Sequence, residues 1–133
     1  MSQENVEIVK RALEAFNGRR LDSIRELTAP DFEWSPAIPG AVDTEVYRGS
    51  QGAETYFEEI RATWRELQIV VDEFRDLGSS VLTFGRIVGR GMSSGIEVDT
   101  PLTIVFELRG GKVARSRGYL NRADALKAVG LEE

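Results

Sequence analysis

Two charged residues stand where they could act on a bound molecule. Glu33 lies between Phe32 and Trp34, and Arg86 lies among alternating apolar and glycine residues. A carboxylate in an apolar pocket gains a raised pKa and can act as a general base, while an arginine can hold a ligand oxygen on which negative charge develops. The alternative is that Phe32 and Trp34 fill the core and Glu33 faces solvent, with Arg86 reaching solvent or a second subunit. We favour this alternative, because apolar burial is the commoner arrangement and a buried unpaired charge is costly.

The composition limits the chemistry that these groups could join. The 133 residues include no histidine and no cysteine, which removes the usual base near neutral pH, the commonest metal ligands and any thiolate nucleophile. We therefore expect no metal and no cofactor. Acid–base chemistry would have to use Asp, Glu, Tyr, Lys or Arg side chains, or water held by them.

Charge and hydropathy restrict the partners of the chain. The net charge of −5 argues against binding nucleic acid through its phosphates. No apolar run approaches the roughly 20 residues that span a bilayer, and residues 1–10 lack the pattern of a secretion signal. A cytoplasmic protein without membrane or nucleic-acid partners is the expectation.

A long hairpin over residues 96–120 is predicted to form the floor of a pocket. Leu102, Ile104 and Phe106 alternate with polar positions, which is the period of a strand with one buried face. Gly110 and Gly111 supply a turn that tolerates positive φ, and residues 113–120 run back. These three apolar side chains are therefore predicted to contact a ligand.

The returning strand alternates small and large side chains. Ala114, Ser116 and Gly118 are expected to face the helices and leave room for a ligand, with Ser116 as a pocket-lining hydroxyl. The residues of the other parity are expected to face outward, where they suit a subunit interface; they are Arg115, Arg117 and Tyr119.

The other segments indicate an α+β domain spanning residues 1–133. Apolar residues at three- and four-residue spacing predict helices over 2–17, 21–27 and 51–64, and a short closing helix over 123–129. Strands are predicted at 32–35, 67–77 and 81–91, before the hairpin. Helices followed by antiparallel strands are typical of a curved sheet wrapped around helices.

Aromatic and polar residues outside the hairpin complete the predicted pocket. Trp34 and Ser35 on the first strand are candidate ligand contacts, as is Tyr56 on the helix 51–64, although we favour packing of that helix on the sheet as the role of Tyr56. Tyr47 could overhang the mouth of the pocket, beside a loop at 36–46 that is a candidate lid.

The chain resembles the SnoaL-like polyketide-cyclase branch of the nuclear transport factor 2-like superfamily. The resemblance covers nearly the whole chain and rests on the order and spacing of four motifs, namely Ala15-Phe16-Asn17-Gly18, Pro30-Asp31-Phe32-Glu33-Trp34, Tyr47-Arg48-Gly49, and Gly111-Lys112-Val113 followed by Tyr119-Leu120-Asn121-Arg122-Ala123-Asp124-Ala125-Leu126. It implies a cone-shaped curved sheet, mostly antiparallel, around an apolar cavity, and a homodimer packed through the sheet. This fold hosts isomerases, cyclases, hydrolases and binding modules, so it implies no single activity.

Functional positions carried over from the family argue against its best-known reactions. Ketosteroid isomerases of this fold use a tyrosine and two aspartates, whereas the matching positions here are Ala12, Ser35 and either Thr103 or Ile104. Many cyclase-like relatives carry Asp where this chain has Asn121, and an amide cannot exchange a proton as a carboxylate can. Asn121 therefore remains only a candidate ligand contact.

Three functions follow from the residues and the resemblance. The first is a protein that binds a small, mostly apolar molecule in the cone, with cyclase- or isomerase-type activity that uses Glu33 as base and an arginine such as Arg86. The second is a ligand-binding or dimeric scaffold domain without catalysis. The third is an epoxide-hydrolase-like enzyme, which requires an aspartate–arginine–aspartate cluster in the cavity, with Asp99, Arg86 and Arg90 as its raw materials.

Overall fold

The computed structural model describes residues 2–37 and 46–131. Most of the candidate lid, residues 38–45, lies outside the described residues, so its role as a lid stays a prediction. No helix in the described part of the chain is long and apolar enough to cross a membrane.

Two helices open the chain. The helix α1 (Ser2–Asn17) buries Val9, Leu13 and Phe16, whose spacing places them on one side of the helix. The chain leaves α1 through Arg19, which has a φ of 54°, and the short helix α2 (Leu21–Leu27) follows.

Six strands and two further helices complete the fold. In chain order they are β1 (Thr28–Ser35), β2 (Tyr47–Arg48), α3 (Gly49–Thr63), β3 (Trp64–Asp76), β4 (Ser80–Gly91), β5 (Glu97–Arg109), β6 (Lys112–Tyr119) and α4 (Arg122–Ala128). The strands form one sheet in the order β2-β1-β6-β5-β4-β3. Only β1 and β6 pair in parallel among these neighbours. The predicted α+β architecture with a mostly antiparallel sheet is confirmed.

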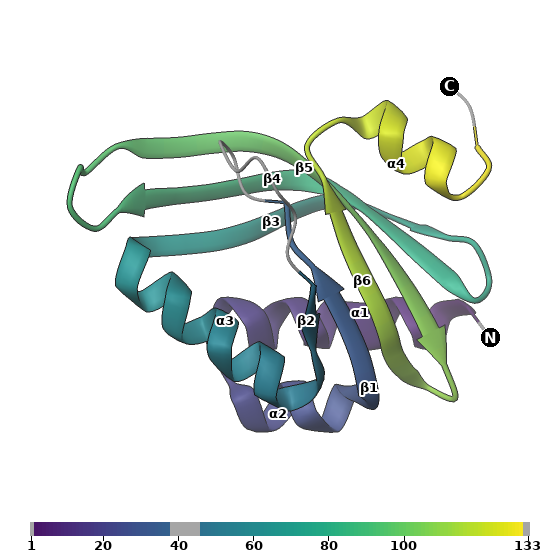
Figure 1. Cartoon of the computed structure of the whole chain (residues 1–133). Coiled ribbons are helices and arrows are strands. Elements are labelled where there is room, and N and C mark those ends of the chain that lie inside the picture. Colours follow the sequence, from purple (N-terminus) through teal and green to yellow (C-terminus); the bar gives the residue numbers. More distant parts are fainter. Residues whose placement is uncertain (1, 38–45, 132–133) are drawn as a thin grey trace.

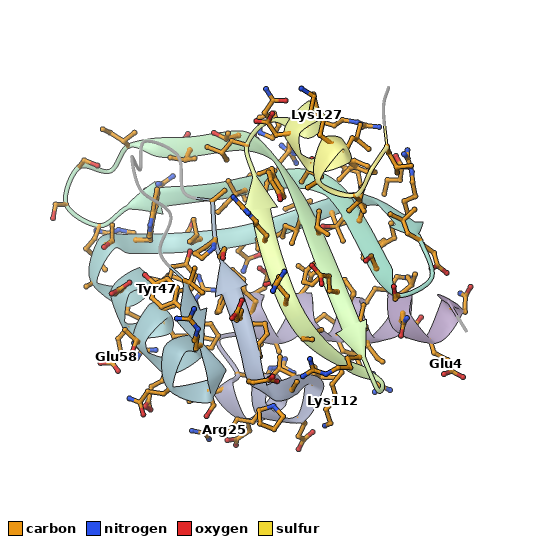
Figure 2. All side chains as sticks on the ribbon, turned by 45° about the vertical axis from the view of Figure 1, so that its right-hand side comes forward. Glu4, Arg25, Tyr47, Glu58, Lys112 and Lys127 are labelled. Carbon is orange, nitrogen blue, oxygen red and sulfur yellow. The ribbon has the colours of Figure 1, made fainter. Side chains whose placement is uncertain are left out.

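The sheet has two differently covered faces. Its inner face curves around α1 and α3, with α2 below, whereas α4 lies on the opposite, outer face (Figure 1). The larger hydrophobic core lies between the inner face and the helices. A smaller core under α4 contains Leu82, Phe84, Val105, Ala125 and Leu126. Charged side chains labelled in Figure 2, such as Glu4, Glu58 and Lys127, extend from the periphery.

The end of α1 is fastened to the free edge of the sheet. The Asn17 side chain donates to the Ile69 carbonyl at 2.9 Å and accepts from the Ile69 amide at 2.9 Å. The Arg19 guanidinium donates to the Leu67 carbonyl at 2.6 Å. Because β3 is an edge strand, these bonds occupy backbone groups that would otherwise be free to pair with another chain.

Element boundaries differ from the sequence prediction at three strands. Trp64, predicted to continue the helix 51–64, instead begins β3, three residues before the predicted start of that strand. The strand β1 begins at Thr28, four residues earlier than expected. Its register with β6 shifts between Thr28 and Glu33. This irregularity accommodates Pro30, which has no amide hydrogen to donate to a neighbouring strand. The two-residue strand β2 was not predicted, since its only register is with Glu33 and Trp34 of β1.

Candidate functional site

An apolar cavity lies between the inner face of the sheet and the helices. Its volume is about 60 Å³, measured as the space open to the centres of water molecules. A water needs roughly 10–15 Å³ by this measure, so the cavity has room for a few waters or one small molecule. No charged side chain lines it among the described residues, which are Ala12, Leu13, Phe16, Ile24, Thr28, Phe32, Trp34, Pro36, Ala37, Tyr56, Ile69, Ile87, Leu102, Ile104, Phe106, Val113, Ser116 and Gly118.

Aromatic rings form one wall of this cavity. The ring of Trp34 lies 4.6 Å from Tyr56 and 5.3 Å from Phe16 between centroids, both in edge-to-face geometry. The ring of Phe32, which also lines the cavity, lies 6.1 Å from Trp34, and Phe57 packs against Trp34 at the same centroid distance without reaching the lining. Such packing is favourable beyond the burial of area, so the wall is a stable surface for a ligand to contact.

Three hydroxyl groups interrupt the apolar lining. The Thr28 hydroxyl donates to the Ile24 carbonyl at 2.7 Å and is therefore satisfied within the protein. The hydroxyls of Tyr56 and Ser116 have no hydrogen-bond partner among the described residues, although both residues are buried. No polar side-chain atom in the described part of the chain is both fully buried and unpaired, so these two hydroxyls touch open space.

Burial keeps the Tyr56 hydroxyl protonated. It raises the pKa of Tyr56 well above its ordinary value of 10.0, with Arg19 opposing and Glu59 adding to the shift. Burial likewise lowers the pKa of Arg19, whose guanidinium lies over the Phe16 ring at 4.8 Å. The neutral phenol can donate a hydrogen bond throughout the neutral pH range.

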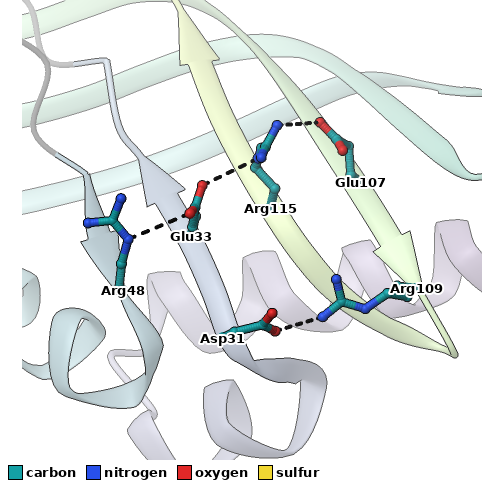
Figure 3. A network of polar contacts seen from close by, with 6 residues as sticks. All are labelled: Asp31, Glu33, Arg48, Glu107, Arg109 and Arg115. Carbon is teal, nitrogen blue, oxygen red and sulfur yellow. Dashed lines mark hydrogen bonds and ion pairs between the residues drawn. The ribbon is translucent and has the colours of Figure 1, made fainter.

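Glu33 lies on the outer face, away from the cavity. Its carboxylate is 3.5 Å from Arg48 and 3.5 Å from Arg115, which also contacts Glu107 (Figure 3). A neighbouring pair joins Asp31 to Arg109 at 2.6 Å. The geometry does not support Glu33 as a base for a molecule in the cavity, and these exposed pairs contribute little stability.

Arg86 also lies on the outer face and has a partner there. Its guanidinium donates to both oxygens of Asp99, at 3.1 and 2.9 Å, and Arg90 binds Glu97 at 2.9 Å. All four side chains are substantially exposed. The aspartate–arginine cluster that an epoxide-hydrolase-like site requires inside the cavity is therefore absent from the described lining.

Six of the predicted ligand contacts line the cavity together, and three do not. Those that line it are Trp34, Tyr56, Leu102, Ile104, Phe106 and Ser116. Ser35 faces an outer depression beside Glu33. Tyr47 is buried, and its hydroxyl donates to Glu59 at 2.5 Å. The Asn121 side chain caps α4 by accepting from the Ala123 amide at 2.8 Å, which gives it a structural role.

The inward parity of β6 differs in part from the prediction. Ser116 and Gly118 line the cavity as expected, but Val113 joins them and Ala114 does not. The register shifts here, since Glu107 pairs with Arg115 and Leu108 with Val113, leaving Ala114 as an extra residue. This bulge reverses the alternation within the strand.

Sequence reasoning missed the part of the lining that the helices and the adjacent strands supply. Ala12, Leu13 and Phe16 project from α1, and Ile69 and Ile87 from β3 and β4. The helical spacing of the α1 residues signalled burial, but spacing alone does not distinguish a side chain in a packed core from one at a cavity wall.

Two other depressions have larger volumes and more polar linings. One, of about 710 Å³, runs along β3 beside Arg19, Arg61 and Arg65. The other, of about 560 Å³, lies on the outer face between Glu33, Arg117 and α4. The described residues contain no group of acidic side chains that could hold a metal ion.

The fold and this cavity define an α+β cone with an internal apolar site. The sequence profile of the SnoaL-like domain matches residues 9–116, which is most of the chain. The protein therefore belongs to the SnoaL-like domain family, within the nuclear transport factor 2-like superfamily. A comparison with proteins of curated function finds no match.

Solved structures with this fold are numerous. A nuclear transport factor 2-like protein from Burkholderia xenovorans LB400 is 26% identical, with 90% of each chain covered and a TM-score of 0.75. A putative SnoaL-like polyketide cyclase from Jannaschia sp. CCS1 is 23% identical, covering 89% of this chain and 85% of its own, with a TM-score of 0.73. A nuclear transport factor 2-like protein of unknown function from Burkholderia pseudomallei K96243 is 18% identical, covering 96% and 98%, with a TM-score of 0.77.

Proposed function

We propose that this protein binds a small, mostly apolar molecule in the cavity and does so without charged acid–base groups. The proposal rests on the lining of the cavity. None of the described residues that line it is charged, and most of them are apolar. Concave, largely apolar sites with a few polar groups are the usual form of small-molecule sites. Binding here would derive from removing apolar surface from water.

A cyclase- or isomerase-type activity is the second candidate function. Membership of the SnoaL-like domain family supports it, whereas the geometry of the cavity does not. The cyclase-like structural relative makes ring-closure chemistry a reaction to test. With Glu33 and Arg86 both bound to partners on the outer face, such activity would have to rely on hydroxyl groups of the cavity. We therefore place binding first.

Filling the cavity is expected to abolish binding. Ala12 lines the cavity from α1 and is 8% exposed, so Ala12→Leu adds three carbon atoms to a space of about 60 Å³. Leucine is compatible with a helix, and the fold should persist. With toluene as the probe, calorimetric titration should give an affinity at least tenfold weaker for Ala12→Leu than for the unchanged protein.

Two variants control this experiment. Ala62→Leu places the same side chain on an exposed position of α3 and should leave toluene binding unchanged. Glu33→Gln should leave it unchanged as well, because Glu33 faces away from the cavity. Equal toluene affinities for Ala12→Leu and Ala62→Leu would refute the cavity as the binding site. A loss of toluene affinity in Glu33→Gln would show that the Glu33 carboxylate takes part in binding.

We further propose that two copies associate through the outer face of the sheet. The support is the row formed by Arg115, Arg117 and Tyr119 beside Glu33 and Glu107, because mixed charges with an aromatic residue can complement a second copy. Sedimentation equilibrium should give twice the 14.8 kDa chain mass, and Arg117→Glu should shift the protein toward monomer. A monomer at high micromolar concentration would refute this proposal.

A further inference from the structure

We infer that the ligand of the cavity is an uncharged molecule carrying an oxygen atom, which the hydroxyls of Tyr56 and Ser116 recognise by hydrogen bonding. This inference rests on the proposed binding function and specifies the class of ligand. A pure hydrocarbon and a carboxylate are then both poorer ligands than a small alcohol, phenol or ketone.

The hydroxyls of Tyr56 and Ser116 have no partner among the described residues. Tyr56 is 3% exposed and Ser116 is 5% exposed, yet neither hydroxyl bonds to another described residue. Because neither hydroxyl is fully buried, each keeps contact with open space, and a ligand that excluded water from it without offering a hydrogen bond would leave it unpaired, which is unfavourable; the Thr28 hydroxyl in the same lining is already satisfied by the Ile24 carbonyl. A ligand oxygen, or water that it displaces, would satisfy the two remaining groups.

Tyr56 and Ser116 both lie next to one aromatic residue, Trp34. Ser116 on β6 is the register partner of Trp34 on β1, and Tyr56 on α3 packs edge-to-face against the same Trp34 at 4.6 Å. The two residues therefore approach Trp34 from different elements. A ligand lying beside Trp34 would therefore have a hydroxyl-bearing residue of the sheet on one side and one of α3 on the other.

The described lining of the cavity holds no cation that could neutralise an anionic ligand. Arg19 stands near Tyr56, but it does not line the cavity, and its guanidinium donates to the carbonyls of Phe16 and Leu67. A carboxylate in the cavity would lose its hydration and meet no cation. Burial holds the pKa of Tyr56 above its ordinary value, so the phenol remains a donor to a neutral acceptor.

The test uses three probes of one ring size, phenol, toluene and benzoate, measured by calorimetric titration at pH 7. The double variant Tyr56→Phe with Ser116→Ala keeps the aromatic wall and removes both hydroxyls. We expect it to weaken phenol binding about tenfold relative to toluene, which is the scale of one net hydrogen bond. Benzoate should show no binding to either protein.

A matched double variant, Tyr119→Phe with Ser80→Ala, removes the same groups from the outer face and should leave the phenol-to-toluene ratio unchanged. The inference would be overturned if the double variant Tyr56→Phe with Ser116→Ala kept the phenol-to-toluene affinity ratio of the unchanged protein, or if benzoate bound as tightly as phenol. In either case, toluene binding would still support the cavity as the binding site. If no probe bound the unchanged protein, the proposed function would fail with it.

Discussion

Replacing Gly85 by alanine will lower the free energy of unfolding by about 3 kcal/mol or more, because the added methyl group has no room. A Cβ at Gly85 would stand 1.9 Å from the carbonyl oxygen of Val70 and 2.8 Å from the Cα of Val71. Both contacts are with backbone, which cannot rotate away. Here β3 shifts register between Val71 and Glu73 and comes close to β4, so the strands would have to separate.

Urea denaturation of Gly85→Ala beside Gly91→Ala tests this expectation. Gly91 lies on the same strand and parity, but the close neighbour of its Cβ would be the side-chain oxygen of Ser94, at 2.7 Å, which can rotate, while the backbone of Ile96 lies at an ordinary contact distance of 3.9 Å. Gly91→Ala should cost about 1 kcal/mol or less, as is usual near the surface. Equal midpoints for the two variants would contradict the close approach of β3 to Gly85.

Replacing Phe16 by alanine will cost about 3–5 kcal/mol of unfolding free energy, the usual range for removing a buried phenylalanine. Phe16 is 5% exposed, and its ring contacts Trp34, Tyr56 and Phe57 at centroid distances of 5.3, 6.3 and 6.0 Å. It also lines the cavity, so the substitution enlarges that space. Saturating toluene should therefore recover part of the loss, since a ligand of the folded state stabilises it.

The comparison for Phe16→Ala is Phe16→Leu, which removes three side-chain carbon atoms instead of six and should therefore cost about half as much. Both are measured by urea denaturation, with and without toluene. A loss for Phe16→Ala no larger than the loss for Phe16→Leu would mean that the aromatic wall does not support the core. A loss that toluene leaves unchanged would mean that the vacated space is closed to ligands.

The sequence predicts the sheet side of the cavity because strands have only two faces. Leu102, Ile104 and Phe106 are two residues apart along one strand, so their side chains lie on the same face. If one of them points toward the helices, the other two do so as well. The same logic places Ser116 on the inner face. The fold class follows from the order of helices and strands, which the structure confirms.

The remaining features depend on contacts between segments far apart in the chain. Glu33 meets Arg115 only because β1 pairs in parallel with β6, and Phe16 meets Trp34 only because α1 packs on the inner face. The bulge at Ala114 is a single irregularity that no periodicity reveals. Charged residues flanked by apolar ones, such as Glu33, therefore have an orientation that local sequence cannot fix.

The most direct test of the account is a crystal structure of the protein soaked with phenol. The account predicts ring-shaped density in the cavity, beside Trp34, with the phenol oxygen within hydrogen-bonding distance of Tyr56 or Ser116. Phenol bound only in the depression on the outer face near Glu33, with the cavity unchanged at saturating concentration, would contradict it.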